Sequence, residues 1–354
     1  MNEKNPQFNR PEPLVVGSAS LETKKEKARQ IVERFGEYHY EQFSSRQRTI
    51  LESSEIKKSK CEKLAIEKIN EITNSILSEF KLDVFNVPER NVHLIPDKLF
   101  KEITKDETIT GATSEIMQLI LLNAEALKDP MSRISAMLHE IIHLKSFLVL
   151  EVHEDLKRVY RGGVTVGALR EKSERVGYFM MFGGLNEAIV TEIQKRYLKK
   201  CFSEVVSTLE KMSDLGSYDQ FLIDEYHWQD SKEARNFKRK LIKEAFPDRG
   251  EDEIVWVGRN ESGYDLLGYY GQRKVLNYIV DVLFKDNTDR FNSEDEVMKL
   301  FFKAHFDGKL FAIAKLIEKS FGEGSFRIIG MMSEKDENSI GQVMDYLQKH
   351  RKKI

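Results

Sequence analysis

The stretch SAMLHEIIHLKSF, residues 135–147, places two histidines and a glutamate inside an otherwise apolar run. Residues four apart share one face of an α-helix, so His139 and His143 can present two imidazoles to a single metal ion. Glu140 is one residue from His139 and three from His143. It can therefore reach a water beside the ion without binding the ion itself. Two metal ligands and a general base are the parts of a zinc-dependent hydrolytic site.

An ordinary pair of hydrogen-bonded or solvated histidines is the alternative interpretation of this stretch. With 8 histidines in 354 residues, a chance HExxH is expected in roughly one chain in a hundred. Solvated histidines would also require water around this helix, whereas its apolar residues predict that it is buried on nearly every side. These residues are Ile134, Met137, Leu138, Ile141, Ile142 and Leu148. The sequence therefore favours a metal site.

A second motif, LNEAIVTE, follows within GGLNEAIVTEI and is predicted to be helical. HEIIH followed by such a helix resembles the gluzincin metallopeptidases, the thermolysin-like clan, over about residues 86–200. In that clan the third metal ligand is a glutamate in an N-E-A motif on the second helix. The resemblance implies that His139, His143 and Glu187 bind Zn²⁺ and that Glu140 is the general base.

The resemblance has two departures. The step of 44 residues from His143 to Glu187 is longer than in thermolysin, which is consistent with an inserted hairpin. The second departure concerns the residue that supports the ligands. The clan usually has an acidic residue four positions after the ligand glutamate, where this chain has Thr191. Glu192 comes five positions after Glu187, and at about 100° per residue it lies about 140° around the helix. We therefore expect the Thr191 hydroxyl, and not Glu192, to lie on the side of the site.

Two other residues compete with Glu187 for the role of third ligand. His153 follows His143 by ten residues, and Asp265 in GYDLLGYYG resembles the aspartate ligand of aspzincins. The metzincin pattern needs a glycine and a histidine at positions where this chain has Ser146 and Val149. Glu187 is favoured, with Asp265 and His153 as the alternatives.

Hydrolysis of an amide needs one more donor for the oxygen of the tetrahedral intermediate. In gluzincins a tyrosine or histidine outside the HExxH helix supplies it. A helix over residues 262–285 is expected to form the second wall of the cleft, and it carries Tyr270 and Arg273 on one apolar stripe. Tyr270, or its neighbour Tyr269, is the candidate catalytic donor. A tyrosine in such a stripe is also often a packing residue.

The local patterns predict a largely helical chain with two short strands near the site. Strands are expected at 91–95 and 116–122, and the resemblance makes the second one the edge strand that pairs with substrate backbone. Asp129 and Pro130 are expected to open the motif helix, which runs to about residue 150. Residues 164–182 are predicted to form a hairpin. Asn186 is expected to cap a helix to about residue 200, and only helices are expected after it.

These elements together indicate an α+β fold that is mostly helical. The expected parts are a zincin-like catalytic core with a small mixed sheet, a helical N-terminal arm and a helical C-terminal subdomain. Their ranges are 1–20 for a flexible tail, 21–85 for the N-terminal helices, 86–200 for the core and 201–354 for the subdomain that closes the cleft.

Composition gives the remaining expectations. The net charge of -2 indicates neither a nucleic acid nor a membrane partner. The chain shows no signal peptide and no apolar run of about 20 residues, and its two cysteines fit a reducing compartment. We therefore expect a cytoplasmic zinc metallopeptidase with a peptide or protein substrate. The alternatives are a degenerate zincin with a regulatory or scaffold role, and a non-peptide amidase on the same site. Nothing in the sequence indicates the oligomeric state.

Overall fold

The computed structural model describes residues 10–34, 49, 51, 53–115, 117–153, 157–172, 175–259 and 263–352. The fold is α+β, largely helical with small mixed sheets, as the sequence predicted. The chain forms two compact units. The first contains Met1–Pro11, Gln30–Leu144 and Gln194–Leu267, and the second contains Glu12–Arg29, Lys145–Ile193 and Gly268–Ile354. Each unit is thus assembled from separate stretches, whereas the ranges expected from the sequence are consecutive.

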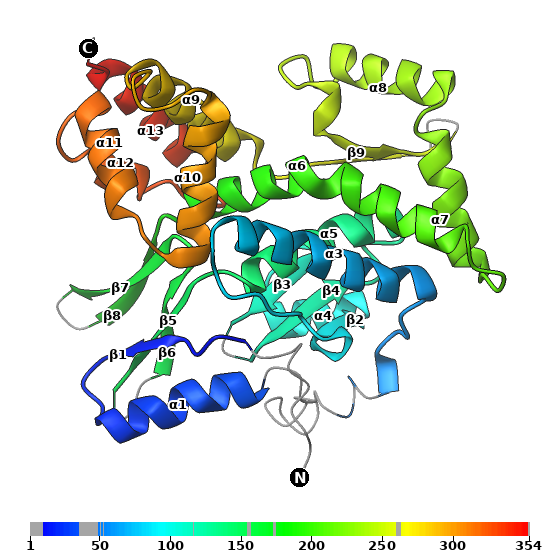
Figure 1. Cartoon of the computed structure of the whole chain (residues 1–354), viewed down its shortest axis with the longest axis horizontal. Coiled ribbons are helices and arrows are strands. Elements are labelled where there is room, and N and C mark those ends of the chain that lie inside the picture. The colour runs from blue at the N-terminus through cyan, green and yellow to red at the C-terminus, as the bar shows by residue number, and fades with distance from the viewer. Residues whose placement is uncertain are drawn as a thin grey trace. The chain divides into compact units, whose positions relative to one another are not determined.

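The first unit combines a three-stranded sheet and a two-stranded hairpin with helices (Figure 1). Its strands are β2 (Val92–Ile95), β3 (Gly111–Ser114), β4 (Leu119–Asn123), β9 (Ile254–Val257) and β10 (Tyr264–Leu266). Its helices are α3 (Lys60–Glu79), η3 (Glu89–Asn91), α4 (Asp97–Thr104), α5 (Pro130–Leu144), α7 (Ser217–Trp228), α8 (Lys232–Glu244) and η4 (Glu251–Glu253). The expectation of helices alone after residue 200 was wrong, because β9 and β10 pair in antiparallel fashion.

The three-stranded sheet has the order β2-β4-β3. β4 is parallel to β2 and antiparallel to β3, and all five of its residues are buried. A strand with partners on both sides and cover on both faces needs a continuous apolar run, which LILLN supplies. The sequence predicted the edge strand at 116–122, and this was wrong. Residues 119–123 form the central strand, and the edge strand beside α5 is β3.

Helix α5 carries the HExxH motif and packs against α3, α7, β3, β4 and β9. The amide of Ser132 donates to the Asp129 carboxylate at 2.7 Å, which confirms Asp129 as the capping residue. Ile134, Met137, Leu138, Ile141 and Ile142 are all fully buried, as predicted. The helix ends at Leu144 and not near residue 150, because Leu148–Val152 forms strand β5.

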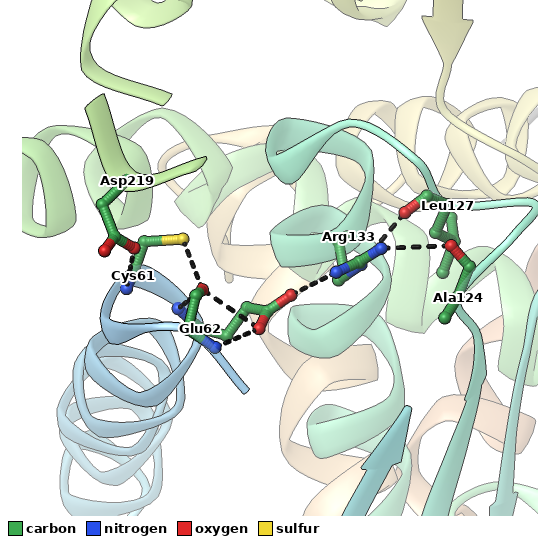
Figure 2. Close-up of polar contacts among 7 residues, drawn as sticks. Cys61, Glu62, Ala124, Leu127, Arg133 and Asp219 are labelled. Atoms are coloured by element: carbon green, nitrogen blue, oxygen red, sulfur yellow. Dashed lines mark hydrogen bonds and ion pairs between the residues drawn. The ribbon is translucent and has the colours of Figure 1, made fainter. Parts of the chain in front are cut away.

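A buried ion pair ties the first half of α5 to α3 (Figure 2). The Arg133 guanidinium pairs with Glu62 and donates to the carbonyls of Leu127 at 3.0 Å and Ala124 at 3.1 Å. The Glu62 carboxylate also accepts from the backbone and hydroxyl of Ser59, the N-cap residue of α3. Arg133 thus connects α5 with α3 and with the segment that leads into α5.

The second unit contains a five-stranded sheet of order β1-β5-β6-β7-β8 (Figure 1). Its strands are β1 (Leu14–Val16), β5 (Leu148–Val152), β6 (Lys157–Gly162), β7 (Thr165–Lys172) and β8 (Arg175–Met181). Its helices are α1 (Leu21–Arg34, of which it holds residues to Arg29), α9 (Tyr270–Lys285), α10 (Glu294–Asp307), α11 (Phe311–Phe321), α12 (Ser325–Ile329) and α13 (Glu337–His350). The predicted hairpin at 164–182 is confirmed as β7 and β8. Leu14–Val16, expected in a loose tail, pairs with β5 instead.

Helix α6 (Gly183–Leu209) carries the second motif and contributes residues to both units. It begins three residues before the predicted cap, Asn186, and two glycines form its first turn. Phe182 has a left-handed backbone with φ of 64°, and its amide donates to the carbonyl of Gly330. A Cβ on Gly184 would lie 2.8 Å from the carbonyl of Met332, so this close approach of two backbones requires a glycine.

Helix α9 is shorter than the helix predicted at 262–285. It begins at Tyr270, after Tyr269 with a left-handed φ of 53°, and Tyr264–Leu266 is strand β10. The apolar spacing in α9 was correct, since Leu276, Val280 and Leu283 are buried. Within the described part of the chain, no helix has the length and apolarity needed to cross a membrane.

Replacing Arg133 by Met tests whether the buried ion pair anchors α5. The change leaves the Glu62 carboxylate buried without its cation, so we expect the first unit to lose about 3–5 kcal/mol of unfolding free energy. Urea titration followed by circular dichroism measures this loss. Adding Glu62→Leu should restore part of it, because the unpaired charge is then gone. The control is Arg29→Met, which removes an exposed ion pair with Glu26. It should leave the urea midpoint of unfolding almost unchanged. An equal loss in both single variants would contradict the anchoring role.

Candidate metal centre

The two histidines of α5 face each other, as their spacing predicted. Nε2 of His143 lies 3.1 Å from Nε2 of His139, and both side chains are partly exposed in a helix whose other residues, except Ala136, are buried. A zinc ion binds imidazole nitrogen at about 2.0–2.1 Å, so two nitrogens on one ion lie at most about 4.2 Å apart. The separation therefore allows both Nε2 atoms to bind one ion.

Gln194 of α6 fixes the orientation of the first imidazole. Its Nε2 donates to the carbonyl of Ser135 at 2.9 Å and to the Ser135 hydroxyl at 2.8 Å. The amide oxygen is thereby directed at Nδ1 of His139, 3.2 Å away. Because this oxygen can only accept, Nδ1 of His139 carries the proton and Nε2 keeps its lone pair. That is the tautomer a metal ligand needs.

Glu140 is held by the edge strand β3. The Thr113 hydroxyl lies 2.8 Å from Oε2 of Glu140 and 3.0 Å from its backbone carbonyl. A Cβ on Gly111 would lie 2.7 Å from Oε1 of Glu140, so the absence of a side chain at 111 leaves room for the carboxylate. The carboxylate is therefore positioned by β3 and is 8% exposed.

Glu187 completes a group of three potential ligands. The ligand atoms of His139, His143 and Glu187 all lie within 4.8 Å of one another. Among the residues that the structure describes, this is the group of histidine, cysteine and acidic side chains with the geometry to hold a metal ion. Gln194 follows Glu187 by seven residues, which at 100° per residue puts both on nearly the same face of α6. Since Gln194 contacts His139, the same face of α6 directs Glu187 toward the two histidines.

The donor set indicates which metal would fit. Two imidazole nitrogens and one carboxylate oxygen are the protein ligands of many catalytic zinc sites, which leave a fourth position for water or substrate. Gln194 supplies the outer hydrogen bond that ligating histidines usually have. These three side chains therefore fit Zn²⁺.

The two alternative ligands have other partners. The Asp265 carboxylate accepts from the Ser132 hydroxyl at 2.7 Å, and that hydroxyl also accepts from Nε1 of Trp256. Burial raises the pKa of Asp265, as expected for a carboxylate in a packed interior. His153 follows β5 and bonds to the Ser18 hydroxyl at 2.7 Å and to Glu151 at 3.1 Å. Neither residue belongs to the group of three.

Thr191 and Glu192 are the two residues that were weighed as support for the ligands. The Thr191 hydroxyl is buried and has no hydrogen-bond partner among the described residues. Glu192 lies away from the ligand face, as its angle predicted, and pairs with Arg273 at 3.3 Å. The Arg273 side chain is 2% exposed.

Tyr270, the predicted oxyanion donor, is the first residue of α9. The Arg273 guanidinium lies 5.9 Å from the centre of its ring and the Lys274 ammonium 5.5 Å from it. The proximity of Tyr270 and Arg273 was predicted from their spacing. These contacts suit a packing tyrosine, and the catalytic role of Tyr270 or Tyr269 stays a prediction.

Four residues beside the site were missed by sequence reasoning: Gln194, Thr113, Gly111 and Glu115. Gln194 could have been found by its helical spacing from Glu187, which puts it on the ligand face of α6. The other three lie in or directly after β3. That strand was not predicted, so no sequence signal connected it to the motif helix.

Comparison with known proteins adds no relative. No protein-family model, no curated protein and no solved structure matches the chain. The site must be judged from its own geometry.

Replacing Gln194 by Ala tests the support of His139. Without the amide oxygen, the imidazole loses its fixed tautomer, and we expect Zn²⁺ affinity to fall by about 10- to 100-fold. Competition with a chromogenic chelator measures the affinity, which in the parent should reach about one Zn²⁺ per chain.

The matched control is Gln229→Ala, because Gln229 is also buried and bonds to both backbone groups of Val257. It should lose stability and keep parental Zn²⁺ affinity. In the same assay Glu187→Ala should weaken binding and Asp265→Ala should not. The reverse pattern would make Asp265 the ligand.

Proposed function

We propose that this chain is a zinc-dependent metallopeptidase whose site is formed by α5, α6 and β3. The observation that carries the proposal is the group of His139, His143 and Glu187, with ligand atoms within 4.8 Å of one another, next to the nearly buried carboxylate of Glu140. Three ligands and a separate base have different roles, and a purely structural metal site has no use for the base.

The arrangement of α5 and its sheet supports a zincin-like core over about residues 86–200. The motif helix packs against a mixed sheet, and β3, the strand beside it, is antiparallel to its neighbour. Among the described residues no strand pairs with the outer edge of β3. We infer that a peptide substrate adds to this edge as a further strand, so that its backbone is held by main-chain hydrogen bonds.

When bound by these side chains, Zn²⁺ polarises a carbonyl oxygen and lowers the pKa of water toward about 7. Glu140 accepts the proton of the attacking water and passes it to the leaving nitrogen. The Thr113 hydroxyl keeps one oxygen of Glu140 in place. The free lone pair of the other oxygen is then available for the water, since a carboxylate accepts several hydrogen bonds.

Two details favour an enzyme over a degenerate zincin with a scaffold role. Glu140 is present, and its carboxylate has both a positioning donor, Thr113, and a glycine opposite it, Gly111. A scaffold protein would need neither. A non-peptide amidase uses the same water and base, so it is distinguished by substrate alone.

Glu140→Gln is the decisive variant for the proposed reaction. The amide cannot accept the proton, so cleavage should fall by at least about 100-fold while Zn²⁺ content stays parental. Mass spectrometry of a peptide library incubated with the Zn²⁺-loaded protein measures the cleavage. Uncut peptides together with hydrolysis of small N-acyl amides would indicate the amidase. A parental rate in Glu140→Gln would contradict the role of the base.

Gly111→Ala tests the positioning of the base without touching its chemistry. The new Cβ would lie 2.7 Å from Oε1 of Glu140, so the carboxylate must move. We expect turnover to fall by about 10- to 100-fold, because small misplacements of a catalytic group are costly. The fold should tolerate the change, since a flexible side-chain end can move aside. The control is Gly341→Ala, whose Cβ would meet nothing within 4 Å. Equal turnover in both variants would refute the arrangement.

A further inference from the structure

A buried arginine from the start of the chain lies beside the turn that leaves β3. Arg10 is 5% exposed, and its Nη1 donates to Oε1 of Gln118 at 2.6 Å. Its guanidinium also lies 5.7 Å from the centre of the Phe85 ring. All three residues belong to the first unit. Residues 10–13 belong to no helix or strand, and β1 begins at Leu14.

This arginine is costly for the fold to bury. A guanidinium has five N–H donors, and among the described residues the Arg10 side chain donates to the neutral amide of Gln118. Burial lowers the pKa of Arg10 to about 10, and the negative charge of Glu115 raises it in part. A buried cation whose hydrogen bond goes to a neutral amide stabilises a fold poorly. Its burial therefore needs a reason other than stability.

Glu115 connects Arg10 with the candidate active site. It is the first residue after β3 and follows Thr113 by two residues. Thr113 contacts Glu140. Burial raises the pKa of Glu115, the charges of His143 and Arg10 lower it, and the charge of Glu140 raises it. The charge of Glu115 thus acts on His143, Glu140 and Arg10, and the Gln118 side chain that accepts from Arg10 also donates to the Glu115 carbonyl.

The turn itself is held in an uncommon conformation. Gln118 has a left-handed backbone with φ of 58°, which is strained for a residue with a side chain. The Asn91 side chain donates to the Gln118 carbonyl, and the Gln118 side chain donates to the carbonyl of Glu115. Backbone strain that is fixed from two directions is typical of ligand-binding positions. The result is that Oε1 of Gln118 points at the guanidinium.

We propose that Glu115, Gln118 and Phe85 form a guanidinium-binding subsite of the candidate active site, and that Arg10 occupies this subsite in cis in place of an arginine side chain of the substrate. The inference rests on the proposed function, because it names a side chain of the substrate and a competitor for the same site. The segment around Arg10 then acts as an intramolecular inhibitor that must leave before a substrate arginine enters.

The chemistry of the subsite favours guanidinium over ammonium. An aromatic face, an amide oxygen and a carboxylate suit a flat, weakly hydrated cation that stacks and donates at the same time. A lysine ammonium is more strongly hydrated and cannot stack, so it loses more on entering a buried site. The substrate class that follows is a peptide with an arginine next to the cleaved bond.

Binding of agmatine to Arg10→Met tests the subsite without any hydrolysis. Agmatine carries a guanidinium, and 1,4-diaminobutane is the matched probe with an ammonium in its place. Arg10→Met should bind agmatine at least about tenfold more tightly than the parent, in which the subsite is filled, and about tenfold more tightly than it binds diaminobutane. Isothermal titration calorimetry on the full chain, with and without Zn²⁺, measures both affinities.

The double variant Arg10→Met, Glu115→Gln lacks the negative charge of the subsite, and its affinity for agmatine should be about tenfold lower than that of Arg10→Met. If Arg10→Met does not fold, Arg10→Lys keeps the charge, and agmatine should displace the poorly fitting lysine and raise the melting temperature. Equal agmatine affinity in the parent and the Arg10 variants, or no effect of Glu115→Gln, would overturn the proposal. Agmatine binding in a chain that neither holds Zn²⁺ nor cleaves peptides would keep the subsite and reject the proposed function.

Discussion

Helix α5 is enclosed by protein along nearly its whole length, and every other feature of the site depends on this constraint. α3, α7, β3, β4 and β9 surround it, and its apolar residues are fully buried. Such a helix cannot rotate or slide without opening cavities in a close-packed interior. The few polar side chains that it carries are therefore held in fixed directions, and each must find a partner.

Those partners come from segments far apart in the sequence. Arg133 reaches Glu62 of α3, His139 meets Gln194 of α6, and the Glu140 carboxylate accepts from Thr113 of β3. Each contact fixes a different part of the helix: its first turns, its first imidazole and its carboxylate. These contacts distinguish a preorganised site from two histidines that only share a helix face, because hydrogen-bond partners of the ligands fix the orientation of the ligands.

In the proposed enzyme, the edge strand β3 would contribute to positioning of the base, to catalysis and to substrate binding. Gly111 leaves room for the Glu140 carboxylate, Thr113 orients it, and the charge of Glu115, directly after the strand, acts on Glu140, His143 and Arg10. In an extended chain, alternate residues lie on one face, so Gly111 and Thr113 share the face toward α5. A substrate strand on the free edge of β3 would then run past the base and toward the guanidinium subsite. Cleavage position and side-chain preference would both follow from one strand.

The sequence by itself determined what local spacing controls. The face shared by His139 and His143, the cap at Asp129, the burial of α5 and the hairpin at 164–182 all depend on residues within a few turns of one another. The angle that directs Glu192 away from Glu187 was correct for the same reason. Errors at element ends were also local: α5 stops at Leu144 because the next residues join a sheet, and α6 starts at Gly183 because Phe182 turns the chain.

What only the tertiary structure decided is which distant segments meet. β3 was not predicted, because four residues of mixed polarity, GATS, carry little strand signal without their partner β4. The partners of Asp265, His153 and Arg273 could not be predicted either, because an ion pair or hydrogen bond between remote residues leaves no periodic pattern in the sequence. The roles of Thr113, Gln194 and Glu115 belong to this second kind of information. Residue type sets the chemistry that a side chain can perform, and packing of remote segments sets whether it meets a partner for that chemistry.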